Sequence, residues 1–148
     1  MRKIQVITLF PEMFAGVFGS SMMWKAQKDG YVELLTIDLR QFGIGPRRTV
    51  DDTPYGGGDG MLLMVEPLWN AVQQAKQIDP GAKVLIMTPR GQRWRQALAQ
   101  QYSESEDGYI VICGRYEGYD ERIMALVDQE LSVGDYVLTG GELPAMTI

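Results

Sequence analysis

The sequence has no histidine and a single cysteine, Cys113, among its 148 residues. Without histidine the chain can build neither a histidine-based catalytic triad nor the usual zinc site, and one cysteine cannot form a disulfide within the chain. No apolar run approaches the length of a membrane span, and no small-residue cleavage site follows the amino terminus. We therefore expect a cytoplasmic protein with no membrane partner.

Positive charge is also scarce. Fourteen lysines and arginines against 19 aspartates and glutamates give a net charge of −5. This balance argues against a broad basic surface for nucleic acid, although a local pair such as Arg47 and Arg48 can still hold phosphates. The length is that of one domain able to bury most of its apolar surface.

Short apolar runs alternate with segments of helical periodicity. Strands are predicted at 3–8, 31–39, 83–87, 109–113 and 130–133, and helices after Pro11 and at 22–28, 66–79, 92–102, 119–127 and 142–146. Residues 40–61 lack this periodicity and are predicted to form a long loop. The alternation predicts an α/β fold in which helices cover both faces of a parallel sheet.

Two glycine-containing stretches near the end of the chain predict a ligand pocket. Residues 113–118 follow a buried strand, and residues 134–141 hold the apolar trio Tyr136, Val137 and Leu138 between glycines. Loops at the carboxyl ends of parallel strands form the ligand crevice of open α/β sheets, and glycine lets the backbone turn sharply there. The backbone of this trio could form hydrogen bonds with the edge of an adenine while Leu138 packs on its face. Alternatively, the trio forms a buried loop in a tight core.

Three other patterns give little support for a specific functional site. The glycines at 56–60 lack the Gly-Lys-Ser/Thr of a phosphate-binding loop and the spacing of a dinucleotide fingerprint. Cys113 has no histidine partner and is best read as a small buried hydrophobe. The charged residues from Arg115 to Arg122 could form ion pairs with one another at the exposed start of a helix. Alternatively, Arg115 and Glu117 lie between glycines at the end of a strand, where their side chains would face a cleft.

Four motifs together resemble a known family. They are Leu-Phe-Pro-Glu-Met-Phe at 9–14, Thr-Val-Asp-Asp-Thr-Pro-Tyr-Gly-Gly-Gly at 49–58, Cys-Gly-Arg-Tyr-Glu-Gly at 113–118 and Gly-Asp-Tyr-Val-Leu-Thr-Gly-Gly-Glu-Leu-Pro-Ala-Met at 134–146. In this order, and over essentially the whole chain, they closely resemble the bacterial tRNA (guanine-N1)-methyltransferases of the SPOUT superfamily. Four long motifs in sequence are far more specific than any one glycine pattern.

The resemblance implies a homodimer whose α/β domain ends in a deep trefoil knot, a topology that general rules of chain connection would exclude. It implies methyl transfer from S-adenosylmethionine to N1 of the guanosine 3′ of the anticodon in tRNA. Arg115 and Glu117 would take supporting catalytic roles, and Arg47, Arg48 and Arg115 would contact phosphates or bases. Carried over by motif, the cofactor-binding residues are Met87, Thr88, Pro89, Gly114, Tyr116, Glu117, Gly118, Ser132, Val133, Gly134, Asp135, Tyr136, Val137, Leu138, Gly140, Gly141 and Pro144.

Members of this family are longer than the chain. Their general base, an aspartate, lies in a linker after the knot, and a helical tRNA-binding domain follows. We therefore expect residues 1–148 to be the cofactor-binding knotted domain, truncated after the knot, which binds S-adenosylmethionine but is inactive alone. The family is also associated with Mg²⁺, and no cluster of metal ligands stands out in the sequence.

Two other functions are compatible with the residues alone. One is a non-catalytic module that binds a nucleotide or RNA, which the absence of histidine and of an evident general base favours. The other is a nicotinamide-dependent α/β enzyme, which the missing dinucleotide fingerprint disfavours. Cofactor binding and tRNA methylation distinguish the three.

Overall fold

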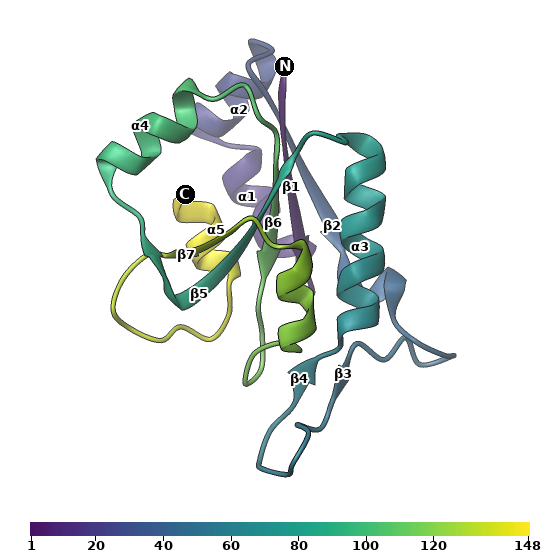
Figure 1. The fold of residues 1–148 in the computed structure, drawn as a ribbon. Helices are drawn as coiled ribbons and strands as arrows, with labels where there is room; N and C mark the ends of the chain where they lie inside the picture. The colour runs from purple at the N-terminus through teal and green to yellow at the C-terminus, as the bar shows by residue number, and fades with distance from the viewer.

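A five-stranded parallel sheet forms the centre of the computed structural model, which describes all 148 residues. Its strand order is β2-β1-β6-β5-β7, and every neighbouring pair is parallel (Figure 1). The strands are β1 (Arg2–Thr8), β2 (Val32–Asp38), β5 (Lys83–Arg93), β6 (Tyr109–Cys113) and β7 (Gln129–Ser132). The predicted α/β fold with a parallel sheet is therefore confirmed.

Helices cover both faces of this sheet, as predicted. The α-helix α3 and the 3₁₀ helix η3 lie on one face, and α1, α4 and α5 lie on the other (Figure 1). The α-helices are α1 (Ala15–Phe18), α2 (Ser21–Lys28), α3 (Val65–Ile78), α4 (Gln96–Glu104) and α5 (Glu142–Thr147), and the 3₁₀ helices are η1 (Pro11–Phe14), η2 (Leu39–Phe42) and η3 (Glu121–Leu126). None of these helices has the length and hydropathy of a membrane span.

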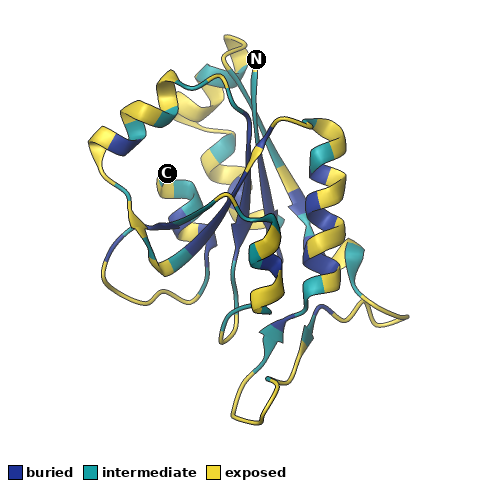
Figure 2. Cartoon of the chain, in the orientation of Figure 1, coloured by how far each residue is buried: buried dark blue, intermediate teal, exposed yellow.

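The core is divided by the sheet into two clusters. All five residues of β6 are buried, with Ile110 and Ile112 in the cluster under α3 and with Tyr109, Val111 and Cys113 in the cluster on the other face. This alternation follows from the two-residue period of a strand. The central strands are accordingly buried, whereas the loops at one end of the sheet are largely exposed (Figure 2).

Helix α3 forms where the apolar spacing predicts it. Leu68, Ala71, Val72 and Ala75 recur at the helical period, and each is fully buried against the sheet. The helix ends at Ile78, just before Pro80 and Gly81, neither of which favours its continuation.

The segment 40–61 is more ordered than its sequence predicts. Strands β3 (Asp51–Asp52) and β4 (Leu62–Leu63) pair in an antiparallel hairpin, and an isolated bridge joins Ile44 to Thr49. Four glycines of the hairpin loop, Gly56, Gly57, Gly58 and Gly60, have positive φ. Apolar periodicity cannot predict this hairpin, because its strands are short and most of the segment is a glycine-rich turn. The prediction of a structureless loop was wrong.

Three other element predictions need correction. Strand β5 continues through a bulge between Met87 and Gln92 to Arg93, so α4 begins at Gln96 rather than at residue 92. The helix predicted at 119–127 is the shorter 3₁₀ helix η3, whose start is capped by the Asp120 carboxylate accepting from the Arg122 N–H. The alternative of a buried loop at Tyr136–Leu138 is wrong, because all three side chains are exposed.

Candidate functional site

The bulge of β5 and the loops that follow β6 and β7 surround one cavity. The cavity has a volume of about 490 Å³, which is in the range of small-molecule sites. Thr88 and Pro89 contribute from β5, residues 114–119 follow β6, and residues 133–141 follow β7. A crevice at this end of a parallel sheet is where open α/β folds bind ligands.

The loop after β6 is turned sharply and held by the hairpin. Tyr116 has a φ of 59° and Gly118 a φ of 130°, both in the left-handed region. The Glu117 N–H donates to Met61 O at 3.0 Å, and the Leu63 N–H donates to Gly118 O at 3.0 Å. The hairpin therefore fixes the loop that carries Tyr116 and Glu117 into the cavity wall.

The loop after β7 offers polar backbone beside apolar side chains. Only its first turn is closed, where Ser132 Oγ donates to Gly134 O and accepts from the Gly134 N–H. The main-chain N–H groups of residues 135–140 donate no hydrogen bond within the chain. Because Val137 and Leu138 are also exposed, this loop has the unused donors and apolar surface that a flat heteroaromatic ring requires.

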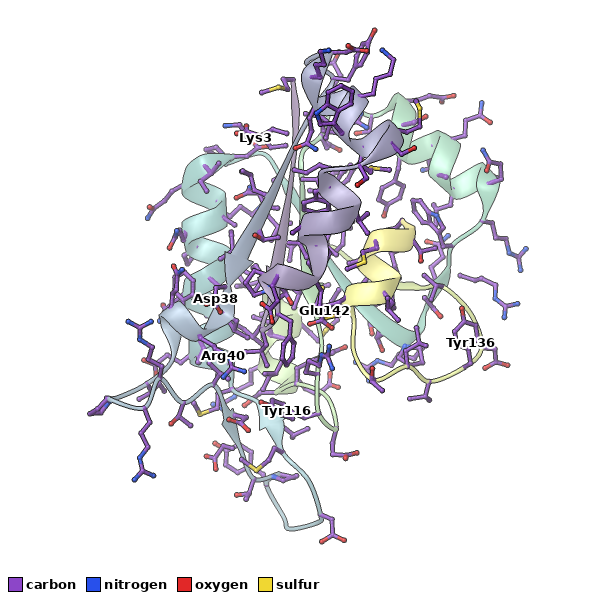
Figure 3. The ribbon with its side chains drawn as sticks, turned by 180° about the vertical axis from the view of Figure 1, so that it is seen from behind. Lys3, Asp38, Arg40, Tyr116, Tyr136 and Glu142 are labelled. Atoms are coloured by element: carbon purple, nitrogen blue, oxygen red, sulfur yellow. The ribbon has the colours of Figure 1, made fainter.

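A buried ion pair lies behind the same loop. Glu142 lies in the first turn of α5 (Figure 3). Arg115 Nε donates to Glu142 Oε2 at 2.9 Å, and the Thr8 hydroxyl donates to Glu142 Oε1 at 2.8 Å. Arg115 also donates from Nη1 to Thr139 O at 3.3 Å, and its guanidinium lies 4.4 Å from the centre of the Phe10 ring. Sequence reasoning did not single out Glu142, although an acidic residue between two glycines and an apolar helix was a signal.

A second charged group lies at the rim of the cavity. Arg90 donates from Nε to Glu130 at 2.8 Å and bridges to Glu121 at 3.0 Å. These hydrogen bonds raise the pKa of the Arg90 guanidinium. Burial raises the pKa of the neighbouring Tyr119 phenol, an effect that the positive charge of Arg90 opposes.

The charged run from Arg115 to Arg122 thus divides in two. Arg115 and Glu117 line the cavity, whereas Arg122 pairs with Asp120 of its own segment at 2.6 Å. That hydrogen bond lowers the pKa of the Asp120 carboxyl. Glu121, which bridges to Arg90, also lines the cavity, so Asp120 and Arg122 are the charged residues of this run that lie outside it.

Sixteen of the 17 residues expected to bind the cofactor line the cavity, together with Arg115. Asp135 is the exception. Arg47 and Arg48 are exposed in the turn before Thr49 and do not line it. The cavity also includes residues that the motifs did not indicate: Leu62, Arg90, Tyr119, Glu121, Leu131 and Thr139.

Two further predictions concern reactive or ligating groups. Cys113 is buried, and burial raises the pKa of its thiol well above the usual value, with the Glu142 carboxylate adding to the effect. The thiol stays protonated, so its interpretation as a small buried hydrophobe is confirmed. No three cysteine, aspartate or glutamate side chains lie close enough together to hold a metal ion.

Comparison with known proteins gives a consistent result. The family model described as "tRNA (Guanine-1)-methyltransferase TrmD" matches residues 2–148. The tRNA (guanine-N(1)-)-methyltransferase of Myxococcus xanthus is 50% identical over 145 residues, 98% of this chain and 59% of its own length. That of Dictyoglomus turgidum is 47% identical over 148 residues, 100% of this chain and 59% of its own length.

A solved structure is similar throughout the fold. The tRNA (m1G37) methyltransferase from Aquifex aeolicus superposes with a TM-score of 0.87 at 39% sequence identity, covering 99% of this chain and 67% of that one. The chain spans about three-fifths of the length of the curated relatives that it matches.

Proposed function

The chain belongs to the tRNA (guanine-1)-methyltransferase family, and from that premise we propose that its 148 residues form the S-adenosylmethionine-binding domain of such an enzyme. The observation that carries the proposal is the convergence of the β5 bulge and two glycine-rich loops on one cavity at the carboxyl end of the sheet. The reaction proposed for the whole protein is methyl transfer to N1 of the guanosine 3′ of the anticodon in tRNA.

The cavity residues fit the cofactor. The unused N–H groups of Val137 and Leu138 would donate to the edge of a purine, while the side chains of Leu138 and Pro144 would cover its faces. Residues 87–89 of β5 and the loop 114–118 would enclose the amino acid part from the opposite side. When bound, the cofactor supplies a methyl group on a positively charged sulfur, a strong electrophile.

Positioning is the main contribution that we assign to this chain. The acceptor nitrogen must lie in line with the methyl–sulfur bond, so loops that fix the ligand supply much of the acceleration. Glu117 at the wall would orient the guanine, and Arg115 would hold the loops in place. Because a base in the anticodon loop is stacked, it must be splayed out before it reaches the cavity.

The remaining parts of the reaction are assigned to the longer protein. By the resemblance, the aspartate that removes the N1 proton and the domain that grips tRNA both lie after residue 148. We therefore propose that this chain binds the cofactor but does not methylate tRNA alone. Arg47 and Arg48, exposed and without an ion-pair partner, would contact phosphates of the anticodon loop.

The trefoil knot, homodimerisation and a cytoplasmic site of action are further proposals from the resemblance. The knot is supported by the close approach of two distant segments, since the Gly141 N–H donates to Gly114 O at 2.8 Å. An experimental structure traced through residues 114–148 tests the knot, and light scattering of the purified chain tests the dimer.

A calorimetric titration with S-adenosylmethionine tests the proposed function. We expect saturable binding near one site per chain, and no binding of NAD. Leu138→Ala should weaken binding about tenfold because it removes apolar contact with the ligand. Leu143→Ala, on an exposed side chain outside the cavity, is the matched control and should bind normally.

The opposite results are equally informative. A folded chain that binds NAD but not S-adenosylmethionine would contradict the proposal. Methylation of undermodified tRNA by the longer protein but not by these 148 residues is expected. Cofactor binding with no methylation by the longer protein would favour the non-catalytic module.

A further inference from the structure

Glu142 is the most completely buried acidic side chain of the fold, with an exposed fraction of 1%. A carboxylate that has lost its water is stable only when it is paired and hydrogen-bonded. Both of its oxygens have partners: Oε1 accepts from the Thr8 hydroxyl, and Oε2 accepts from Arg115 Nε. These three residues come from β1, from the loop after β6 and from the first turn of α5, so one carboxylate joins segments that are far apart in the sequence.

Arg115 extends this connection to the cavity. Its side chain is only 19% exposed, and Phe10 covers one face of the guanidinium. Nη1 donates to the carbonyl oxygen of Thr139, a residue of the loop after β7. Arg115 itself belongs to the loop after β6. The guanidinium therefore connects the two loops that form the cavity together with the β5 bulge, and Glu142 fixes its orientation.

The packing around the pair leaves no room for a side chain at Gly140 or Gly141. A Cβ on Gly140 would lie 2.6 Å from Glu142 Oε2, and a Cβ on Gly141 would lie 2.7 Å from the Cα of Cys113. The Gly141 N–H donates to Gly114 O at 2.8 Å. The two loops thus touch through backbone at this point, and the ion pair holds the contact closed.

We propose that Glu142 is a positioning residue of the cofactor cavity: through Arg115 it holds the loops 114–118 and 133–141 at the separation that the ligand needs. This inference rests on the proposed function for the identity of the ligand. Glu142 lies outside the cavity lining, so its effect on a ligand must pass through Arg115 and the loops.

The variant Glu142→Gln tests the proposal because it keeps the size of the side chain and removes its charge. We expect the dissociation constant of S-adenosylmethionine to rise at least about tenfold, since loss of one partner leaves the buried Arg115 charge uncompensated. The matched control is Asp128→Asn. Asp128 is likewise a hydrogen-bonded carboxylate, which accepts from the Val84 N–H at 2.7 Å, but it lies at the other end of the sheet and outside the cavity. We expect it to bind the cofactor normally.

A double variant separates positioning from a loss of stability. Glu142→Gln combined with Arg115→Met removes both charges, and buried pairs replaced by apolar groups often regain stability. We expect the melting temperature to recover toward the wild-type value. The dissociation constant should stay raised, because methionine at position 115 cannot donate the hydrogen bond that Arg115 makes to Thr139 O. Recovery of affinity together with stability would overturn the proposal, as would normal affinity in Glu142→Gln.

Hydrogen exchange tests the connection without any ligand. In Glu142→Gln, amides of both loops should exchange faster than in the wild type, with the Gly141 N–H among them, whereas Asp128→Asn should leave both loops unchanged. If the wild type binds no S-adenosylmethionine, the proposed function fails, and the exchange rates alone decide whether Glu142 holds the loops. Unchanged exchange in that case would overturn the proposal.

Discussion

The two ends of the central sheet are built in opposite ways. At the amino end, the strands β5 and β6 are entered through short turns, the rings of Tyr102 and Tyr109 stack with centres 5.1 Å apart, and Lys83 pairs with Asp107 at 3.2 Å. At the carboxyl end, long glycine-containing loops surround a cavity. The end that holds the fold together is therefore separate from the end proposed to hold the ligand, and each can be perturbed with its own readout.

The largest effect is expected from Tyr109→Ala at the amino end. Tyr109 is 6% exposed, stacks on Tyr102 and lies under the Arg2 guanidinium. Removing its ring should lower the free energy of unfolding by about 3–5 kcal/mol, as for other large core aromatics. Denaturant unfolding measures this loss.

The same variant should bind S-adenosylmethionine normally at temperatures below its unfolding transition, because no atom of Tyr109 lies near the cavity. Weaker binding by the folded fraction would show that the two ends of the sheet are coupled and cannot be perturbed independently. Tyr31→Ala, at a side chain that is 74% exposed, is the control and should lower stability only slightly.

A pair of glycine substitutions compares the two ends directly. At the carboxyl end, Gly141→Ala would place its Cβ against backbone atoms of Cys113 and Gly114. Backbone cannot move aside cheaply, so we expect a loss of about 1–3 kcal/mol in stability and no measurable cofactor binding. At the amino end, Gly81→Ala would meet only the Asp79 carboxylate at 3.8 Å.

Because Gly81 lies outside the left-handed region, alanine fits its backbone and should change stability by less than about 1 kcal/mol. Thermal unfolding and calorimetry of the two variants measure both quantities. Equal losses in the two variants would show that the close backbone contact at Gly141 does not decide which residue this position tolerates.

The smallest effect concerns pH at the amino end. Hydrogen bonds from Ser105 and then Lys83 lower the pKa of Asp107 below its ordinary value of 3.8. A lowered pKa means that the folded state favours the carboxylate, so its contribution is present above pH 3.8 and is lost as the pH falls through the lowered value. The melting temperature of Asp107→Asn should thus fall less steeply with acid below that pH than the wild type does.

Melting curves between pH 2 and pH 6 measure this difference. Asp59→Asn, on the exposed tip of the hairpin, is the control and should follow the wild-type curve. A wild-type curve that is parallel to that of Asp107→Asn would show that the Ser105 and Lys83 contacts add nothing to the acid sensitivity.

The strands of the sheet and the helices on its faces were predictable because the local spacing of apolar residues determines each of them. The five buried residues of β6 and the helical spacing in α3 each determine an element without reference to the rest of the chain. The hairpin β3–β4 was not predictable in this way, since its strands have two residues each and its register depends on contacts with the loop at Gly118. Strand β5 was underestimated because Pro89 and Gly91 look like a loop, although they lie in a bulge beside β7.

The candidate site shows the same division. Its loops were predictable from glycines that follow strands, and the motifs named most of the residues that line the cavity. The roles of Arg90 and Glu142 depend on partners 27 to 40 residues away, namely Arg115 for Glu142 and Glu121 and Glu130 for Arg90. No local pattern contains such pairs, so only the assembled fold shows them.

The hydrogen bond between Thr8 and Glu142 joins residues 134 positions apart. On the ribosome, chains grow at about 5–20 residues per second, so the first strand is made roughly 7–27 s before its last partner. During that interval β1 and β6 can pair, once β6 has been made. The loops 114–118 and 133–141 cannot yet be held together, because Arg115 still lacks its Glu142 partner. The cavity is therefore completed only after Glu142 has been made, and a nascent chain that stops before Glu142 should be unable to retain the ligand.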